Sequence, residues 1–146
     1  MFSMILDTTY YEKCIKTLEK AYSMLKAENP DSIEYDMYRS ACIKEFEIIL
    51  EQSGKLLRKI LKPYFHSSKE ADKLNFKDIF RHAVLHSLIS DEICVRWLEY
   101  RDNRNNTAHD YGVNFAEDTL VLLPSFIEDA SALAVIIKQQ SNATEG

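Results

Sequence analysis

The segment Ile93–Tyr111 reads ICVRWLEYRDNRNNTAHDY and decides the fold class. Four of its residues recur at spacings of four, three and four: Ile93, Trp97, Tyr100 and Arg104. This spacing is that of one face of an α-helix. Arg104 therefore continues an apolar stripe, where an arginine that merely solvates the surface is not expected. The segment predicts a largely buried helix with an arginine near its end.

His109 follows Arg104 by five residues. On an unbroken helix a step of five residues rotates by about 140°, which places the two side chains on different sides. For them to converge, the helix must end between them. The intervening Asn105-Asn106-Thr107 suits such an end, because these residue types favour caps and turns. The sequence thus predicts a helix end that joins an arginine to a histidine, with Tyr111 two residues beyond.

An arginine and a histidine held together can cleave RNA without a metal. The arginine offers a fixed cation to a phosphate, and the histidine can move a proton near neutral pH. The alternative is a structural pair in which Arg104 caps carbonyl groups at the helix end. The place of Arg104 on the apolar stripe favours the functional interpretation.

Four residues form the pattern R-N-x-x-x-H-x-Y: Arg104, Asn105, His109 and Tyr111. This pattern resembles the motif of HEPN domains, specifically the HepT-like toxins that pair with minimal nucleotidyltransferases. Part of that group is also called nucleotidyltransferase substrate-binding proteins. The preceding Trp97–Tyr100 and the segment Arg39–Glu47 are similar to the family's approach to its motif and to its second helix. Ser53-Gly54-Lys55 stands where the family usually has an aromatic-lysine pair, so the helix surface differs there.

The expected chemistry is metal-independent ribonuclease action in a type VII-like toxin–antitoxin system. A ribose 2′-hydroxyl would attack the adjacent phosphate, with His109 as general base or acid, Arg104 stabilising phosphoryl charge and Asn105 orienting either partner. One histidine cannot be proton acceptor and donor at once, so we expect a homodimer that unites two motifs. The resemblance implies the same dimer. It also implies that a cognate nucleotidyltransferase antitoxin silences the toxin by attaching AMP to Tyr111, for which the alternative is an interfacial packing tyrosine.

A rival interpretation is not enzymatic. In it the chain is a helical subunit that presents a nucleotide or other substrate to a minimal nucleotidyltransferase, with Arg104 on a phosphate and His109 as a ligand contact. A third interpretation, a structural dimer with a degenerate site, is disfavoured because all four motif residues are present. The sequence separates the first two interpretations poorly.

Composition limits where RNA could bind. The chain has 146 residues, enough for one domain, and a formal net charge of −5, so a nucleic-acid site must be local. Four cations are spaced as one helix face: Lys55, Arg58, Lys59 and Lys62. They are candidate contacts for an RNA backbone, although an ordinary solvated face is the favoured alternative.

Cysteine and histidine usage indicates no metal or other cofactor. The three cysteines lack C-x-x-C spacing and lie on or beside apolar stripes, which predicts buried thiols in a reducing compartment. His82 and His86 lie one helical turn apart, but no third ligand accompanies them. We see no signal peptide and no uninterrupted apolar stretch that could span a bilayer, so a cytoplasmic protein without membrane contact is expected.

The remaining pattern is helical. Three glycines and three prolines leave few turns. Expected helix starts are Asp31, Asn75, Ser90 or Asp91, and Asn114-x-x-Glu117. Thr9-x-x-Glu12 is a candidate internal capping box of the first helix, and an earlier start of that helix is left open. Expected breaks are Asn29-Pro30, Pro63, a polar linker over 66–73, and a kink or split at Pro124. The second helix has the most regular stripe: Tyr35, Tyr38, Cys42, Phe46, Ile49, Ser53, Leu56 and Ile60.

The sequence therefore predicts an all-α fold, an antiparallel four-helix bundle with a short additional helix, HEPN-like. Residues 1–138 form its single domain, and residues 139–146 form a polar C-terminal tail that frays.

Overall fold

The structure is a computed structural model that describes residues 6–107 and 113–143, with the side chains of 6–105 and 116–141. Within these ranges every regular element is a helix. Four helices are long: α1 (Thr9–Lys26), α2 (Ile33–Leu61), α5 (Asp91–Thr107) and α6 (Val113–Ala143). Two are short, α3 (Ser68–Asp72) and α4 (Phe76–Leu85), and a 3₁₀ turn, η1 (Lys62–Tyr64), follows α2.

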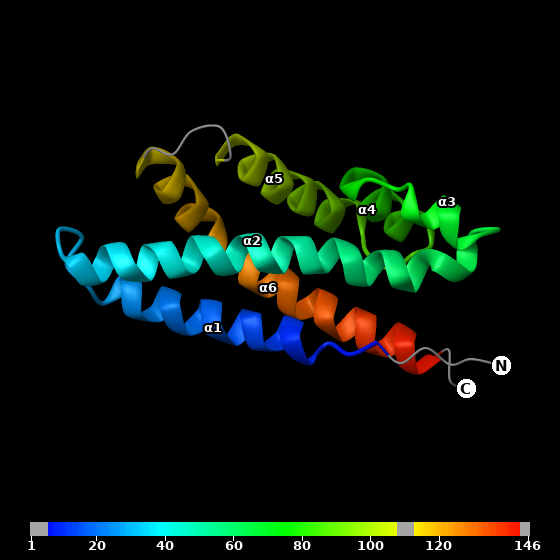
Figure 1. Cartoon of the computed structure of the whole chain (residues 1–146), viewed down its shortest axis with the longest axis horizontal. Helices are drawn as coiled ribbons and strands as arrows, with labels where there is room; N and C mark the ends of the chain where they lie inside the picture. The colour runs from blue at the N-terminus through cyan, green and yellow to red at the C-terminus, as the bar shows by residue number, and fades with distance from the viewer. Residues whose placement is uncertain (1–5, 108–112, 144–146) are drawn as a thin grey trace.

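The long helices form an antiparallel bundle around α2 (Figure 1). In this view α1 and α5 run in one direction, whereas α2 and α6 run in the other. The helix α4 lies against α2 and α5 and is the expected short additional helix. The all-α bundle predicted from the sequence is thus confirmed.

The expected stripe of α2 forms the middle of the core. Five of its residues are buried: Cys42, Phe46, Ile49, Ser53 and Leu56. Opposite them, the stripe of α5 is buried at Trp97 and Tyr100. The Trp97 ring stacks on Phe80 of α4 with centroids 5.1 Å apart, and the Tyr100 ring meets Phe126 of α6 edge-on at 5.0 Å. Aromatic contacts therefore fix α5 against both neighbours.

The three cysteines are free and buried, as expected. Burial raises the pKa of the Cys42 thiol to about 11. A thiol is a poor nucleophile when its thiolate is disfavoured, so Cys42 has a packing role.

Helix starts agree with the sequence in two places and differ in one. Asn75 and Asp78 form a complete capping box, and the Ser90 hydroxyl accepts a hydrogen bond from the Ile93 amide. The start of α2 is capped by Ser32 and not by Asp31. The candidate box at Thr9-x-x-Glu12 is not the helix start: the N-cap is Thr8, in line with the earlier start left open, and its hydroxyl donates to the Glu12 carboxylate.

The C-terminal helix is longer than expected, and of the two outcomes expected at Pro124 a split is excluded, whereas a kink stays a prediction. Pro124 lies inside α6 without splitting it. Residues 139–143 remain helical, beyond the expected domain limit at 138. Ser141 is 3% exposed and its hydroxyl accepts a hydrogen bond of 2.9 Å from the Leu6 amide. This contact ties the last turns of α6 to the segment before α1, and the helix itself continues to Ala143 in place of the expected frayed tail.

The segment 66–73 is not a plain linker. It contains α3, whose start is capped by the Ser67 hydroxyl, and Ala71 is fully buried. One small apolar residue in a polar stretch gives too weak a pattern to predict this turn of helix.

One helix in the described ranges, over Ala116–Ser141, is long and apolar enough to cross a membrane by length and composition. Glu128 and Asp129 interrupt this stretch, so it does not contradict the expectation that no uninterrupted apolar stretch spans a bilayer. The same test is passed by core helices of soluble proteins, and α6 buries Leu123, Phe126 and Leu133 inside the bundle.

Candidate functional site

A ladder of polar contacts joins α5 to α6 and leads to the motif. The Arg96 guanidinium donates two hydrogen bonds to the Asp129 carboxylate, at 2.8 and 2.9 Å. One turn later the Tyr100 hydroxyl donates to Asp129 at 2.6 Å and contacts the Ser125 hydroxyl at 2.9 Å. Burial, and then hydrogen bonding to this carboxylate, raise the pKa of Tyr100, so its phenol stays a proton donor.

The ladder ends beside the motif. The Asn103 side-chain amide donates to the Thr119 hydroxyl at 2.7 Å. Asn103 immediately precedes Arg104, and Thr119 lies in the first turns of α6. The connection that carries His109 and Tyr111 therefore starts and ends on two helices whose relative position is fixed.

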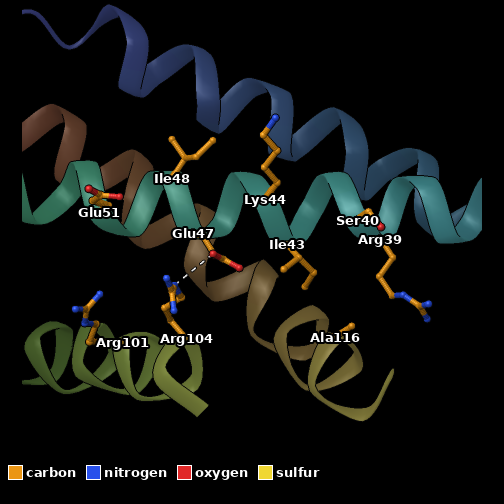
Figure 2. A pocket seen from close by; sticks show the side chains of 10 residues that line it. All are labelled: Arg39, Ser40, Ile43, Lys44, Glu47, Ile48, Glu51, Arg101, Arg104 and Ala116. Carbon is orange, nitrogen blue, oxygen red and sulfur yellow. Dashed lines mark ion pairs between the residues drawn. The ribbon is translucent and has the colours of Figure 1, made fainter. Parts of the chain in front are cut away.

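Arg104 lies one turn beyond Tyr100 and faces α2. Its Nε atom is 3.3 Å from a carboxylate oxygen of Glu47, and the two side chains are 33% and 41% exposed (Figure 2). The sequence analysis missed Glu47 as a site residue, although it ends the segment 39–47 that resembles the family's second helix. Glu47 directly follows the buried Phe46, so its side chain lies beside the apolar face of α2, on the side that meets Arg104 of α5.

Arg104 borders a groove of about 760 Å³ between α2, α5 and the start of α6. The groove is lined by Arg39, Ser40, Ile43, Lys44, Glu47, Ile48, Glu51, Arg101, Arg104 and Ala116. Figure 2 shows Arg101 and Arg104 rising from α5 toward α2, with Arg39 near the other end of the groove. These side chains come from distant parts of the chain, so no local motif could identify them as one site.

Two of the arginines that line the groove, Arg39 and Arg104, contact carboxylates, and a third, Arg101, contacts an aromatic ring. Arg39 contacts Glu117 and Asp36, each at 3.0 Å. The Arg101 guanidinium lies over the Phe76 ring, 5.3 Å from its centroid. The arginines that line the groove therefore already contact acidic or aromatic groups, and a local basic patch for nucleic acid stays a prediction.

Gly54 explains the departure from the family pattern at 53–55. A Cβ atom added at Gly54 would lie 3.2 Å from the Phe76 ring, closer than nearly all such contacts. Glycine therefore lets Phe76 approach α2 and support Arg101. The Ser53 hydroxyl is buried and lies 2.7 Å from the Tyr11 hydroxyl, which further ties α1 to α2.

The described part of the motif is helical throughout. Asn105 is exposed and follows Arg104, and α5 continues through Thr107. The last described residue of α5 is thus Thr107, the third of the residues at which the helix was expected to end, and an end of the helix before His109 stays a prediction. His109 and Tyr111 lie outside the described residues, so the approach of His109 to Arg104 stays a prediction.

The basic face of α2 is largely engaged with the protein itself. Lys55 pairs with Glu51 at 3.2 Å, and Lys62 lies 3.6 Å from Asp72. Arg58 donates to the Leu74 carbonyl at 2.7 Å, whereas Lys59 is exposed. These contacts agree with the favoured structural interpretation, and RNA binding by this face remains a prediction.

The His82 and His86 rings are 6.3 Å apart and pack against aromatic neighbours. His86 stacks on Tyr64 with centroids 3.8 Å apart, and His82 meets Phe65 edge-on at 5.0 Å. Over the part of the chain that the structure describes, no three His, Cys, Asp or Glu side chains are grouped to hold a metal.

Comparison with known proteins identifies the family. Residues 6–139 match the family described as nucleotidyltransferase substrate binding protein like. The chain belongs to this family. A curated relative, the probable ribonuclease HepT of Haemophilus influenzae, is 28% identical over 141 residues, which cover 94% of this chain and 92% of the relative. The chain is thus a HepT-like member of the nucleotidyltransferase substrate-binding, or HEPN, family.

A solved structure from Haemophilus influenzae has the same fold. It is described as the fold of a substrate binding domain of a nucleotidyltransferase. The similarity has a TM-score of 0.77 at 25% identity and covers 91% of this chain and all of that one. One relative is therefore named as a probable ribonuclease and the other as a substrate-binding domain.

Proposed function

We propose that this HepT-like chain is a metal-independent ribonuclease, the toxin of a type VII-like toxin–antitoxin pair that acts on cytoplasmic RNA. The observation that carries the proposal is the position of Arg104, which faces a groove from the end of α5, five residues before His109. The name of the curated relative supports it. Expression of the chain alone, with His109 intact or changed, tests it: growth inhibition must require His109.

The proposed reaction is an internal transesterification. His109 removes the proton from a ribose 2′-hydroxyl, whose oxygen attacks the adjacent phosphorus. The bond from phosphorus to the 5′-oxygen breaks, and the leaving oxygen takes a proton from a second histidine. Arg104 stabilises the charge on the phosphoryl oxygens, and Asn105 orients the histidine or the phosphate. The products are a 2′,3′-cyclic phosphate and a 5′-hydroxyl.

The second histidine comes from a second copy of the chain. We predict a homodimer in solution, with the two His109 side chains facing one shared cleft, because an isologous interface brings identical motifs together. Sedimentation or light scattering at micromolar concentration checks the assembly. A monomer that still cleaves RNA would contradict the composite site, as would a dimer with its motifs on opposite outer surfaces.

Control rests on Tyr111. We predict that a cognate nucleotidyltransferase supplied with ATP adds AMP to its hydroxyl, placing bulk and negative charge two residues from His109. Tyr111→Phe then keeps ribonuclease activity and escapes inactivation, and intact-mass measurement finds AMP on the parent protein alone. Tyr64→Phe, which alters an exposed tyrosine distant in sequence, is the matched control and is inactivated like the parent. Equal AMP addition to both the parent and the Tyr111 variant would assign Tyr111 to packing.

The second candidate function is a binding subunit that presents a nucleotide to a nucleotidyltransferase. The family description and the solved relative favour it. The arginine-lined groove of this chain also suits phosphate groups, since arginine recognises phosphate oxygens in a bidentate manner. The two functions differ in one result: only the ribonuclease cleaves RNA when no partner is present.

A further inference from the structure

The carboxylate of Glu47 lies in the groove beside Arg104. Glu47 lies opposite Arg104 across the groove, and Arg104 is the one ion-pair partner that the structure gives it among the described residues. Both side chains are more than 30% exposed. Ion pairs this accessible to water are weak, because solvent screens them and replaces either partner readily. The contact is therefore one that a better anion can break.

A phosphodiester is such an anion. Its oxygens match the planar donors of a guanidinium, and hydrogen bonds between arginine and phosphate are among the stronger polar contacts in proteins. The groove volume of about 760 Å³ falls in the range of small-molecule sites, so a nucleotide unit fits. A phosphate that reaches Arg104 must meet the Glu47 carboxylate at close range, and like charges repel.

We propose that Glu47 is a built-in competitor, which an RNA phosphate displaces from Arg104 when the substrate enters the groove. The identity of the ligand as RNA rests on the proposed function. The exchange lets a chain with a net charge of −5 take a polyanion at an arginine that already contacts a carboxylate. A ligand anion must therefore bind Arg104 more strongly than the Glu47 carboxylate does, and anions that bind Arg104 weakly do not displace Glu47.

Glu51 provides a matched comparison. It lies one turn further along α2, lines the same groove and has the same charge, but its carboxylate pairs with Lys55 at 3.2 Å. Removing its charge changes the net charge of the protein as much as removing that of Glu47. Removing the charge of Glu51 does not release Arg104, because Glu51 pairs with Lys55.

The test measures binding without cleavage. The probe is a short mixed-sequence 2′-O-methyl oligoribonucleotide, which has no 2′-hydroxyl to attack the phosphate. Glu47→Gln is expected to lower the Kd for this probe by about 3–10-fold, the effect of removing one nearby charge in a partly solvated groove. Glu51→Gln is expected to lower it by less than about twofold. In an Arg104→Ala background the gain from Glu47→Gln falls to that of Glu51→Gln, because the two residues act as a pair.

Three outcomes would overturn the proposal. Weaker binding by Glu47→Gln would show that the carboxylate holds Arg104 in place for the ligand. Equal gains from both glutamine variants would reduce Glu47 to its share of net charge. No binding of the probe by the parent protein would exclude a phosphodiester site. Tighter binding by Glu47→Gln together with no cleavage of natural RNA by the parent would uphold the exchange and contradict only the ribonuclease.

Discussion

Arg104→Ala and His109→Ala are each expected to lower RNA cleavage by a factor of about 10² or more and to abolish growth inhibition. Loss of a general acid or base costs about 10²–10⁴ in rate, and loss of a group that stabilises transition-state charge costs about 10²–10³. Growth assays at matched protein levels, with cleavage measured on purified protein, check both effects.

Two control variants remove an arginine and a histidine that lie away from the site. Arg81 and His66 are exposed on other parts of the surface, and neither lines the groove. Arg81→Ala and His66→Ala should keep activity within about twofold, as is usual for surface changes away from a site. The Arg104 change should leave the fold intact, because its exposed ion pair with Glu47 contributes only about 0–1 kcal/mol. Site variants as toxic as the parent would contradict the catalytic role.

Asp129→Ala is expected to cause the largest loss of stability among single changes in the α5–α6 ladder. Asp129 is 6% exposed and accepts hydrogen bonds from Arg96 and Tyr100. Removing one partner of a buried pair costs about 3–5 kcal/mol, and the partly exposed Arg96 can regain water. We therefore expect the free energy of unfolding to fall by about 2–4 kcal/mol.

Urea unfolding at equal protein concentration measures this loss. The neighbouring Glu128 is exposed, so Glu128→Ala provides an acidic control, expected to change stability by less than about 0.5 kcal/mol. Equal stability of the two variants would mean that the ladder holds α5 on α6 without net free energy.

The parts of the fold that follow from local pattern were predictable. The stripes of α2 and α5 and the capping box at Asn75 depend on residues within a few turns of one another, so the sequence contains them whole. The extension of α6 to Ala143 depends on the contact between Ser141 and Leu6, which are 135 positions apart. A polar stretch read by itself gives no sign of such a contact.

The candidate site shows the same division. Arg104 was found because it continues an apolar stripe and stands in a recognisable motif. Glu47 and Arg39 reach the same groove from α2, and only the packing of α5 on α2 brings them to it. The helical spacing of four cations along the second helix does not reveal that Arg58 donates to a backbone carbonyl or that Lys62 lies beside Asp72, and RNA binding by these cations stays a prediction.

The most direct test of the ribonuclease is cleavage of a short natural RNA by the purified chain in the presence of excess EDTA, with Arg104→Ala and His109→Ala beside it. The account predicts that the parent leaves a 2′,3′-cyclic phosphate and a 5′-hydroxyl, that EDTA does not slow it, and that both variants are at least about 100-fold slower. An intact RNA with the parent protein, or cleavage that EDTA abolishes, would contradict it.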